Sequence, residues 1–464
     1  MLVSVKFAKP AALTGTEEAE LARASAIAQE VGAVDCLVRI ASRRGSLLLR
    51  DGHVDDGLAA LTAGMQLARS ADVNESATSV NLADAYFWLL RPGEGVDVGQ
   101  RGMEHMRARG FEGTLSFGLL VNTTLQCLFL LGDCAGAAKM LAEHLSHDLT
   151  AYGWPLHMAR AQLAICSGED TWPVPRVEDI EALGYHNDEM PTWYAEVSSE
   201  ANLWRGRPRA AWLASERALA TVRGSFWAWR GSQMLANTAR AAADMVDLDR
   251  AADRTSLERT LWQWAGETAS FEPHPARVIC AASGLTFKAE VARLRRDGEE
   301  PAWRAAKSMW AEHGIPHRAA YTGWRLAECL VASGRRRDAE TELAIAHAAA
   351  DTHVPLRREI EALARRARLA LPPSTALSMG EASPADPADH PYGLTPRELE
   401  VLKLLGAGAT NVQIGDRLYM SPKTASVHVS AILRKLGVTG RVQAATVAER
   451  LGLLAGEGQE GGRS

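Results

Sequence analysis

The chain has 464 residues, a hydrophobic fraction of 47%, a charged fraction of 23% and a net charge of −5. This is the composition of an ordinary soluble globular protein, and the length is too great for one hydrophobic core, so we expect two or more domains. The six cysteines form no CxxC pair and no pattern with paired histidines, which favours small core residues in a reducing cytoplasm. The N-terminal apolar run is too short for a signal peptide.

Apolar residues recur with helical periodicity over residues 1–371, and no convincing strand pattern interrupts them, so we predict an all-α fold. A loose motif consists of a glycine, a small residue five positions later and, in three of four copies, a leucine at nine positions. Its glycines lie 80, 74 and 128 residues apart, close to multiples of 37–43 residues, which predicts tetratricopeptide-like helical hairpins. An irregular helical bundle is the alternative. The copies are Gly52, Gly57 and Leu61; Gly132, Ala137 and Leu141; Gly206 and Ala211; and Gly334, Ala339 and Leu343.

The helix expected at residues 113–132 contains no charged residue. Polar side chains interrupt it at its middle, at Asn122, Thr123, Thr124 and Gln126. We therefore predict a helix buried in the domain and not a membrane span. The protein is expected to be cytoplasmic and to have no membrane partner.

Two clusters resemble catalytic or metal sites only superficially. Cys134 lies in a GDCAG run similar to a nucleophile elbow, but an elbow needs a preceding strand, and a helix is predicted there. Glu143, His144 and His147 share a helix face, a spacing that is common by chance. The sequence contains no GxxxxGKS/T phosphate loop and no parallel-sheet receiver pattern. We predict no enzymatic activity, no cofactor and no metal.

Thirteen tryptophans lie between residues 88 and 324 and give the best indication of what the helical domain does. Trp227 and Trp229, like Trp262 and Trp264, are two positions apart, which places the rings about 200° apart on a helix. One ring of each pair could line a groove for a ligand or peptide. We favour the alternative, in which helices covered on both sides accommodate both rings.

Residues 372–393 contain five prolines among small and acidic residues, so we predict a flexible linker after the helical domain. A separate domain follows at residues 394–455, and residues 456–464 are expected to form a disordered tail. The domain holds eight Lys and Arg against four Asp and Glu, a net charge of +4, which leaves −9 on the remainder. A basic terminal module on an acidic body is typical of a protein that binds nucleic acid through its end.

Capping signals mark three helix starts in this domain. The run TPRE places its threonine at the N-cap and its proline at the first helical position, and Glu398 closes a capping box. Thr410 and Gln413 repeat the box for a second helix. A third helix is predicted over residues 421–436, and its apolar residues form one stripe, at Ala425, Val429, Ile432, Leu433 and Leu436. Its other side carries cations, hydroxyls and an outward valine, which suits contact with DNA, although an ordinary solvated face has a similar composition.

Over about sixty residues, TPRE, the helix at 411–418, SPKT, HVS and RKLGV are in register with the LuxR-type helix-turn-helix domain, which this segment resembles. The resemblance implies a tetrahelical domain whose third helix enters the major groove of DNA and whose fourth helix dimerises. The whole chain is similar to the C-terminal half of large ATP-binding LuxR-type regulators. Those carry an NTPase module ahead of their repeats; here the chain is either a naturally short version or has lost its start.

The resemblance also implies the residues that contact DNA and the partner subunit. The base-reading positions are Ser426, Val427 and Ser430. The phosphate-binding residues are expected to be Asn411, Lys423, Thr424, Lys435 and Arg441. The dimer strip is predicted at Val442, Ala445, Ala448 and Leu451. The expected partners are double-stranded DNA, a second copy of the chain on DNA, an unidentified effector or protein for the helical domain, and RNA polymerase as a further candidate.

We therefore predict a transcriptional regulator in which a helical repeat domain controls a LuxR-type DNA reader. One alternative is a protein-interaction scaffold in which DNA binding is secondary. The other is a hydrolase within the helical body, which rests only on isolated cysteine, histidine and glutamate residues such as Cys134.

Overall fold

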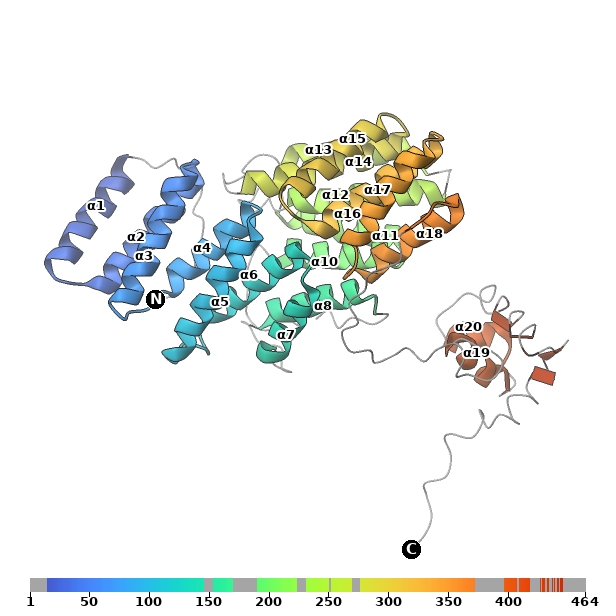
Figure 1. The fold of residues 1–464 in the computed structure, drawn as a ribbon, viewed down its shortest axis with the longest axis horizontal. Coiled ribbons are helices and arrows are strands. Elements are labelled where there is room, and N and C mark those ends of the chain that lie inside the picture. The colour runs from blue at the N-terminus through green and yellow to red at the C-terminus, as the bar shows by residue number, and fades with distance from the viewer. Residues whose placement is uncertain are drawn as a thin grey trace, which may run out of the picture. The chain divides into compact units, whose positions relative to one another are not determined.

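The computed structural model describes residues 15–145, 153–169, 190–222, 231–249, 252–268, 276–371, 396–406 and 409–417, and eleven individual residues between 426 and 444. Within these residues the long elements are all α-helices and there is no strand, so the predicted all-α class is confirmed. The chain divides into two compact units, Met1–Ser374 and Thr375–Ser464, which are described separately below (Figure 1). The predicted linker at residues 372–393 lies outside the described residues, and its boundaries stay a prediction.

The first unit is a stack of antiparallel helices, which run from blue to orange in Figure 1. Its helices are α1 (Gly15–Glu30), α2 (Val34–Asp51), α3 (Val54–Ser70), α4 (Ser76–Trp88), α5 (Pro92–Ala108), α6 (Leu115–Leu131), α7 (Cys134–His144), α8 (Trp154–Ser167), α10 (Met190–Trp204), α11 (Pro208–Val222), α12 (Gly231–Leu248), α13 (Arg254–Thr268), α14 (Arg277–Arg295), α15 (Glu299–Glu312), α16 (Pro316–Ala332), α17 (Arg336–Ala349) and α18 (Val354–Ala367).

The four motif glycines lie at turns between paired helices, as predicted. Gly52, Gly132, Gly206 and Gly334 have φ angles of 97°, 71°, 66° and 75°. This left-handed conformation strains residues that carry a Cβ, so glycine allows each helix to end and the next to begin within two residues. The helix pairs joined in this way are α2–α3, α6–α7, α10–α11 and α16–α17. Their tetratricopeptide-like character stays a prediction.

The small residue of each motif lies at a close contact between helices. Ala137, Ala211 and Ala339 are fully buried. Gly57 comes so close to α2 that a Cβ built on it would lie 2.9 Å from the backbone nitrogen of Leu49 and 3.0 Å from the carbonyl oxygen of Gly45. The motif therefore sets the distance between paired helices.

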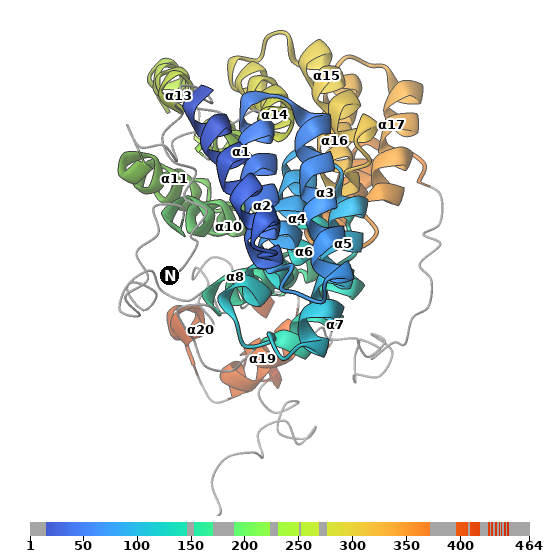
Figure 2. The same ribbon diagram turned by 90° about the vertical axis from the view of Figure 1, so that its left-hand side faces the viewer.

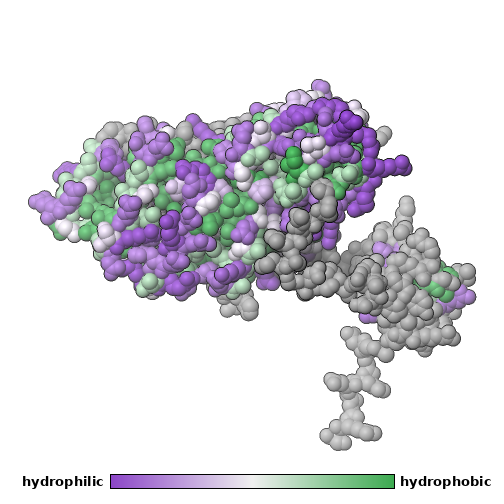
Figure 3. All heavy atoms as spheres, in the orientation of Figure 1, coloured by the Kyte–Doolittle hydropathy of each residue, from purple (hydrophilic) through white to green (hydrophobic). Residues whose placement is uncertain are grey.

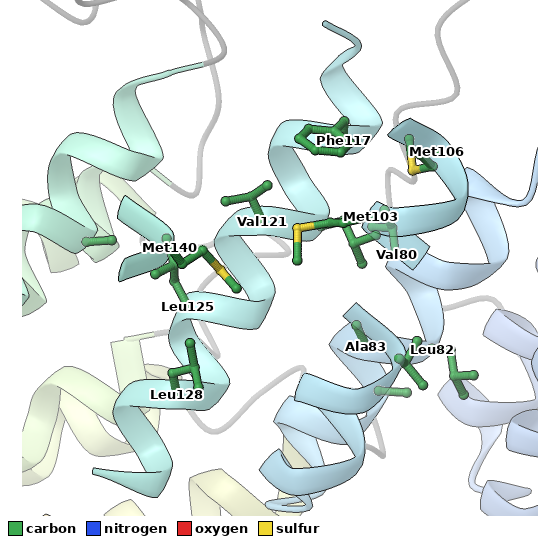
Figure 4. Close-up of a cluster of buried hydrophobic side chains, with 14 of the residues drawn as sticks. Val80, Leu82, Ala83, Met103, Met106, Phe117, Val121, Leu125, Leu128 and Met140 are labelled. Atoms are coloured by element: carbon green, nitrogen blue, oxygen red, sulfur yellow. The ribbon is translucent and has the colours of Figure 1, made fainter. Parts of the chain in front are cut away.

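The N-terminal half of this unit packs side chains from consecutive helices into one core. Figure 4 shows Val80, Met103, Val121 and Met140, from α4, α5, α6 and α7, pointing toward one another. The predicted charge-free segment forms α6 in this core, and its inner side includes the fully buried Leu120 and Leu125. Among the described residues, no helix is long and apolar enough to cross a membrane.

Helices far apart in the sequence also meet, so the stack closes on itself. α4 contacts α14, α6 contacts α16, and α8 contacts α18 (Figure 2). Trp88, Ile279 and Trp310 belong to one buried cluster that spans these halves. At the same junction the Thr352 hydroxyl donates a hydrogen bond to the carbonyl oxygen of Gly132, at 2.7 Å, across 220 residues of sequence.

Two expectations about single residues need correction. Cys127, Cys166 and Cys280 are buried, but Cys36 is exposed and is not the core residue that we expected. Trp264 is buried, whereas Trp262 is 40% exposed at the surface, where it contacts only the edge of Phe287 among aromatic rings that the structure describes.

The two rings of that pair lie on different sides of α13, as the spacing predicts, but the expectation that both are covered is wrong for Trp262, because α13 has a free outer side. Trp227 and Trp229 lie outside the described residues. On the face drawn in Figure 3, hydrophilic side chains gather over α15 and α17, as expected for outer helices of a water-exposed stack.

Candidate nucleic-acid interface

The second unit builds a small hydrophobic core from residues of all its predicted helices. α19 (Pro396–Gly406) begins at the proline predicted as its first helical residue, and α20 (Asn411–Arg417) follows after a short turn. The core residues are at most 8% exposed; they are Val401, Leu402, Leu405, Ala409, Ile414, Ile432, Leu436 and Ala444. The buried carboxyl-bearing residue Glu398 lies in the first turn of α19, where the helix dipole favours a negative charge.

The predicted capping box at the start of α20 is present in full. The backbone nitrogen of Gln413 donates to Thr410 Oγ1 at 3.3 Å, and the backbone nitrogen of Thr410 donates to Gln413 Oε1 at 2.8 Å. These two bonds satisfy donors that a helix start otherwise leaves exposed. They fix the turn that orients α20 against α19.

The predicted third helix is described at six positions, and all six are helical: 426, 428, 429, 432, 433 and 436. Ile432 and Leu436 are buried in the core, and Val429 and Leu433 are partly buried against it. Ser426 is exposed. The apolar stripe predicted from the sequence therefore faces the core at each described position, and Ser426 lies on the outer side, where a base-reading residue has to be. Ala425 lies outside the described residues.

Two of the predicted phosphate-binding residues can be placed. Arg441 is exposed, and its guanidinium donates to the carbonyl oxygen of Ala409 at 2.6 Å. The sequence gave no sign of this bond, which links the turn before α20 to the start of the fourth helix. Asn411 is the first residue of α20; its Oδ1 is buried and accepts no hydrogen bond from the described part of the chain.

The other predicted contact residues lie outside the described residues, and their roles stay predictions. They are Val427 and Ser430 among the base-reading positions, Lys423, Thr424 and Lys435 among the phosphate-binding positions, and the dimer strip of Val442, Ala445, Ala448 and Leu451.

Comparison with known proteins agrees with this geometry. Residues 393–448 match the family described as bacterial regulatory proteins, luxR family. The C-terminal unit is a luxR-family DNA-binding domain. It is similar over 57 residues, with 49% identity, to the transcriptional regulatory protein LiaR of Bacillus subtilis, covering 12% of this chain and 27% of LiaR. The DNA-binding transcriptional activator DevR/DosR of Mycobacterium tuberculosis is 45% identical over 67 residues, which are 14% of this chain and 31% of that protein.

A third relative is a putative HTH-type transcriptional regulator of Mycobacterium bovis, 41% identical over 59 residues, which are 13% of this chain and 7% of that protein. The chain thus spans less than a third of the length of each of these relatives. The matches concern the luxR-family domain, and the helical unit has to be interpreted from its own structure.

The helical unit contains a buried charge cluster that the sequence analysis missed. Asp244 on α12 lies 3.6 Å from Arg240 Nε and 3.5 Å from Arg325 Nη2, and it also pairs with Arg293 of α14. Burial alone would raise the pKa of the Asp244 carboxyl, but the three guanidinium groups outweigh it and lower that pKa. The carboxylate is therefore ionised and holds α12, α14 and α16 together.

Aromatic rings cover the arginines of this cluster. The Arg240 guanidinium lies 4.1 Å from the ring centroid of Trp204, and that of Arg325 lies 4.0 Å from Trp324, distances at which cation–π attraction operates. Tyr321 lies between them, and burial raises the pKa of its hydroxyl to about 12. The charges are matched from within, and we assign this cluster a structural role.

A second buried polar group lies where α8, α10, α16 and α18 meet. Burial would raise the pKa of Glu200, but a hydrogen bond from His353 and the charge of Arg318 lower it to about 2. His317 is 5.2 Å from His353, ring centroid to ring centroid, and burial together with the charge of His353 lowers the pKa of His317 to about 3. No group of three or more His, Cys, Asp or Glu suited to a metal ion exists among the described residues.

Proposed function

We propose that this protein is a sequence-specific transcriptional regulator that reads the major groove with the helix at residues 421–436 and is controlled through its helical unit. The observation that carries the proposal is the luxR-family core, which buries Ile432 and Leu436 and thereby turns Ser426 outward. Val427 and Ser430 follow on the same outer side by helical periodicity, so these three residues read base edges.

Phosphate contacts supply most of the affinity in this proposal. Lys423, Thr424 and Lys435 flank the reading positions on the same helix, and Asn411 and Arg441 lie at the starts of the neighbouring helices. The surrounding domain has a net charge of +4, whereas the remainder of the chain carries −9. The acidic helical unit is therefore repelled by DNA, which leaves it free to receive the regulatory signal.

Dimerisation on DNA follows from the strip of Val442, Ala445, Ala448 and Leu451. These residues recur every three positions, and the small alanines let a second copy of the helix come close. A two-fold pair of reading helices requires an inverted-repeat site.

The proposal is tested by selecting preferred sites from random duplex DNA with the full chain and measuring affinities by fluorescence anisotropy over a range of salt. Lys423→Ala is expected to weaken all sequences alike and to reduce the salt slope by about 1. Val427→Ala is expected to change the preferred base pairs, at a cost of about 1–3 kcal/mol on the best site. Lys288→Ala on α14 removes the same charge from the helical unit and serves as the control.

Equal losses on every sequence for both Lys423→Ala and Val427→Ala would contradict the groove assignment. The role of the helical unit is tested by comparing promoter occupancy of the full chain with that of residues 372–464. Regulation requires a difference between the two. Unchanged occupancy, together with loss of a bound protein partner, would favour an interaction scaffold.

A further inference from the structure

Two cysteines meet at the junction that closes the helical unit. Cys134 is the first residue of α7, and Cys166 lies in the last turn of α8, the helix that packs against α7. Their thiols are hydrogen-bonded to each other, and both cysteines are in the reduced form. Although 32 positions separate them in the sequence, the α7–α8 pair brings their sulfur atoms into direct contact.

The two thiols have different surroundings. Cys134 is partly exposed, so a small molecule in solvent can reach it, whereas Cys166 is 9% exposed. Cys134 also contacts the hydroxyl of Thr352, and its position at the start of α7 directs the positive end of a helix dipole toward its sulfur. The carboxylate of Asp133, the N-cap of α7, acts in the opposite direction.

These surroundings separate the thiols chemically. The hydrogen bond from Cys166 lowers the pKa of Cys134 more than burial and Asp133 raise it, and Thr352 adds to the lowering. The same hydrogen bond and burial raise the pKa of Cys166. Burial also raises the pKa of the Cys127 and Cys329 thiols. Cys134 therefore has the greater thiolate character of the pair, and the thiolate is the reactive form of cysteine.

We propose that Cys134 and Cys166 are a reversible redox pair, in which a hydroperoxide oxidises Cys134 and Cys166 then closes an intramolecular disulfide. In the first step the Cys134 thiolate attacks the peroxide O–O bond, which gives a sulfenic acid and releases the alcohol, or water from hydrogen peroxide. In the second step the Cys166 sulfur attacks the Cys134 sulfur, the S–S bond forms, and the sulfenic oxygen leaves as water. The two thiols lose two electrons and two protons, and the peroxide is reduced.

The position of the pair connects this chemistry to the architecture. Thr352, which contacts Cys134, donates to the Gly132 carbonyl and lies 2.8 Å from His317 Nε2 of α16. Cys166 is two residues from Gly168, where an added Cβ would meet Val354 of α18 at 2.9 Å. A disulfide would shorten the contact between the sulfurs to about 2.05 Å and move the ends of α7 and α8 that hold these bonds.

The test uses the reduced full chain, treated with hydrogen peroxide at neutral pH, alkylated, digested and mapped by mass spectrometry. We expect two of the six thiols to be lost in a single Cys134–Cys166 disulfide and to be restored by dithiothreitol. Cys36→Ser is the matched control: it removes an exposed thiol on α2 and leaves disulfide formation unchanged.

Two further variants test the assigned order of steps. In Cys166→Ser, the peroxide should leave Cys134 as a sulfenic acid that dimedone labels, and no disulfide should form. In Cys134→Ser, Cys166 should remain unlabelled. Circular dichroism of the reduced variants shows whether they fold; if either does not, mapping of the unaltered chain still decides the existence of the pair.

The proposal is overturned if peroxide leaves all six thiols free, if disulfides form only through other cysteines, or if dimedone labels Cys166 in preference to Cys134. None of these measurements depends on DNA binding, so the redox pair and the proposed regulatory function stand or fall separately.

Discussion

Gly57 is predicted to be irreplaceable at the contact between α2 and α3, even by alanine. A Cβ on Gly57 would lie 2.7 Å from Leu49 Cγ, 2.9 Å from the Leu49 backbone nitrogen and 3.0 Å from the Gly45 carbonyl oxygen. Two of these atoms belong to the α2 backbone and cannot rotate away, so the helices would have to move apart. Overpacking of this kind costs about 1–3 kcal/mol, against a gain of about 0.5–1 kcal/mol from replacing glycine in a helix. We expect Gly57→Ala to lower the free energy of unfolding by about 1–2 kcal/mol.

Gly284 provides the matched control, because it lies within α14 and a Cβ there would meet no atom within 4 Å. Gly284→Ala should raise the free energy of unfolding by about 0.5–1 kcal/mol. Urea unfolding followed by tryptophan fluorescence measures both, since all thirteen tryptophans lie between residues 88 and 324 and report on the helical unit alone. The reasoning is refuted if the two substitutions shift the unfolding midpoint in the same direction.

Three further predictions concern the cap of α20, a buried histidine and the dimer strip. Thr410→Ala should destabilise the start of α20 by about 1 kcal/mol, because the Gln413 backbone nitrogen loses its acceptor; faster hydrogen exchange in α20 would show it, and Thr410→Ser should retain protection. The depressed pKa of His317, about 3, means that the unfolded chain binds its proton first. Stability from His317 is thus complete above about pH 6.5 and falls by at most about 1.4 kcal/mol per pH unit below it; urea midpoints at pH 7 and 5 should differ less in His317→Gln. Ala448→Glu should abolish cooperative binding to DNA with two half-sites; cooperative binding as tight as that of the parent would show that the strip is wrongly placed.

The features predicted correctly from the sequence are those fixed by near neighbours. Thr410 and Gln413 are three positions apart and interact through their own turn, so the capping box can be predicted without knowledge of the tertiary fold. The turn glycines follow the same logic, since a left-handed residue at a helix end is a local requirement. Periodicity likewise placed Ile432 and Leu436 in the core, because one helix face repeats regularly.

Features that depend on distant partners could not be predicted in this way. Asp244, Arg293 and Arg325 come from three helices, and a single charged residue on a helix gives no sign of the partner that it will meet. The contact between Cys134 and Cys166 also requires the α7–α8 packing. Trp262 was misjudged because the spacing of two aromatic residues shows that they face opposite ways, but not whether another helix covers the second side.

The hydrogen bond between Thr352 and Gly132 has a consequence for how the helical unit folds. In an open stack of helices each pair touches only its neighbours, so the ends can unravel without the middle and unfolding spreads along the chain. Here contacts across 220 residues join the α6–α7 turn to the segment before α18. Loop closure over that length is slow, and its contacts are lost as soon as either half opens. The late helices therefore act as a latch on the early ones, and the closed part of the stack melts as one cooperative body.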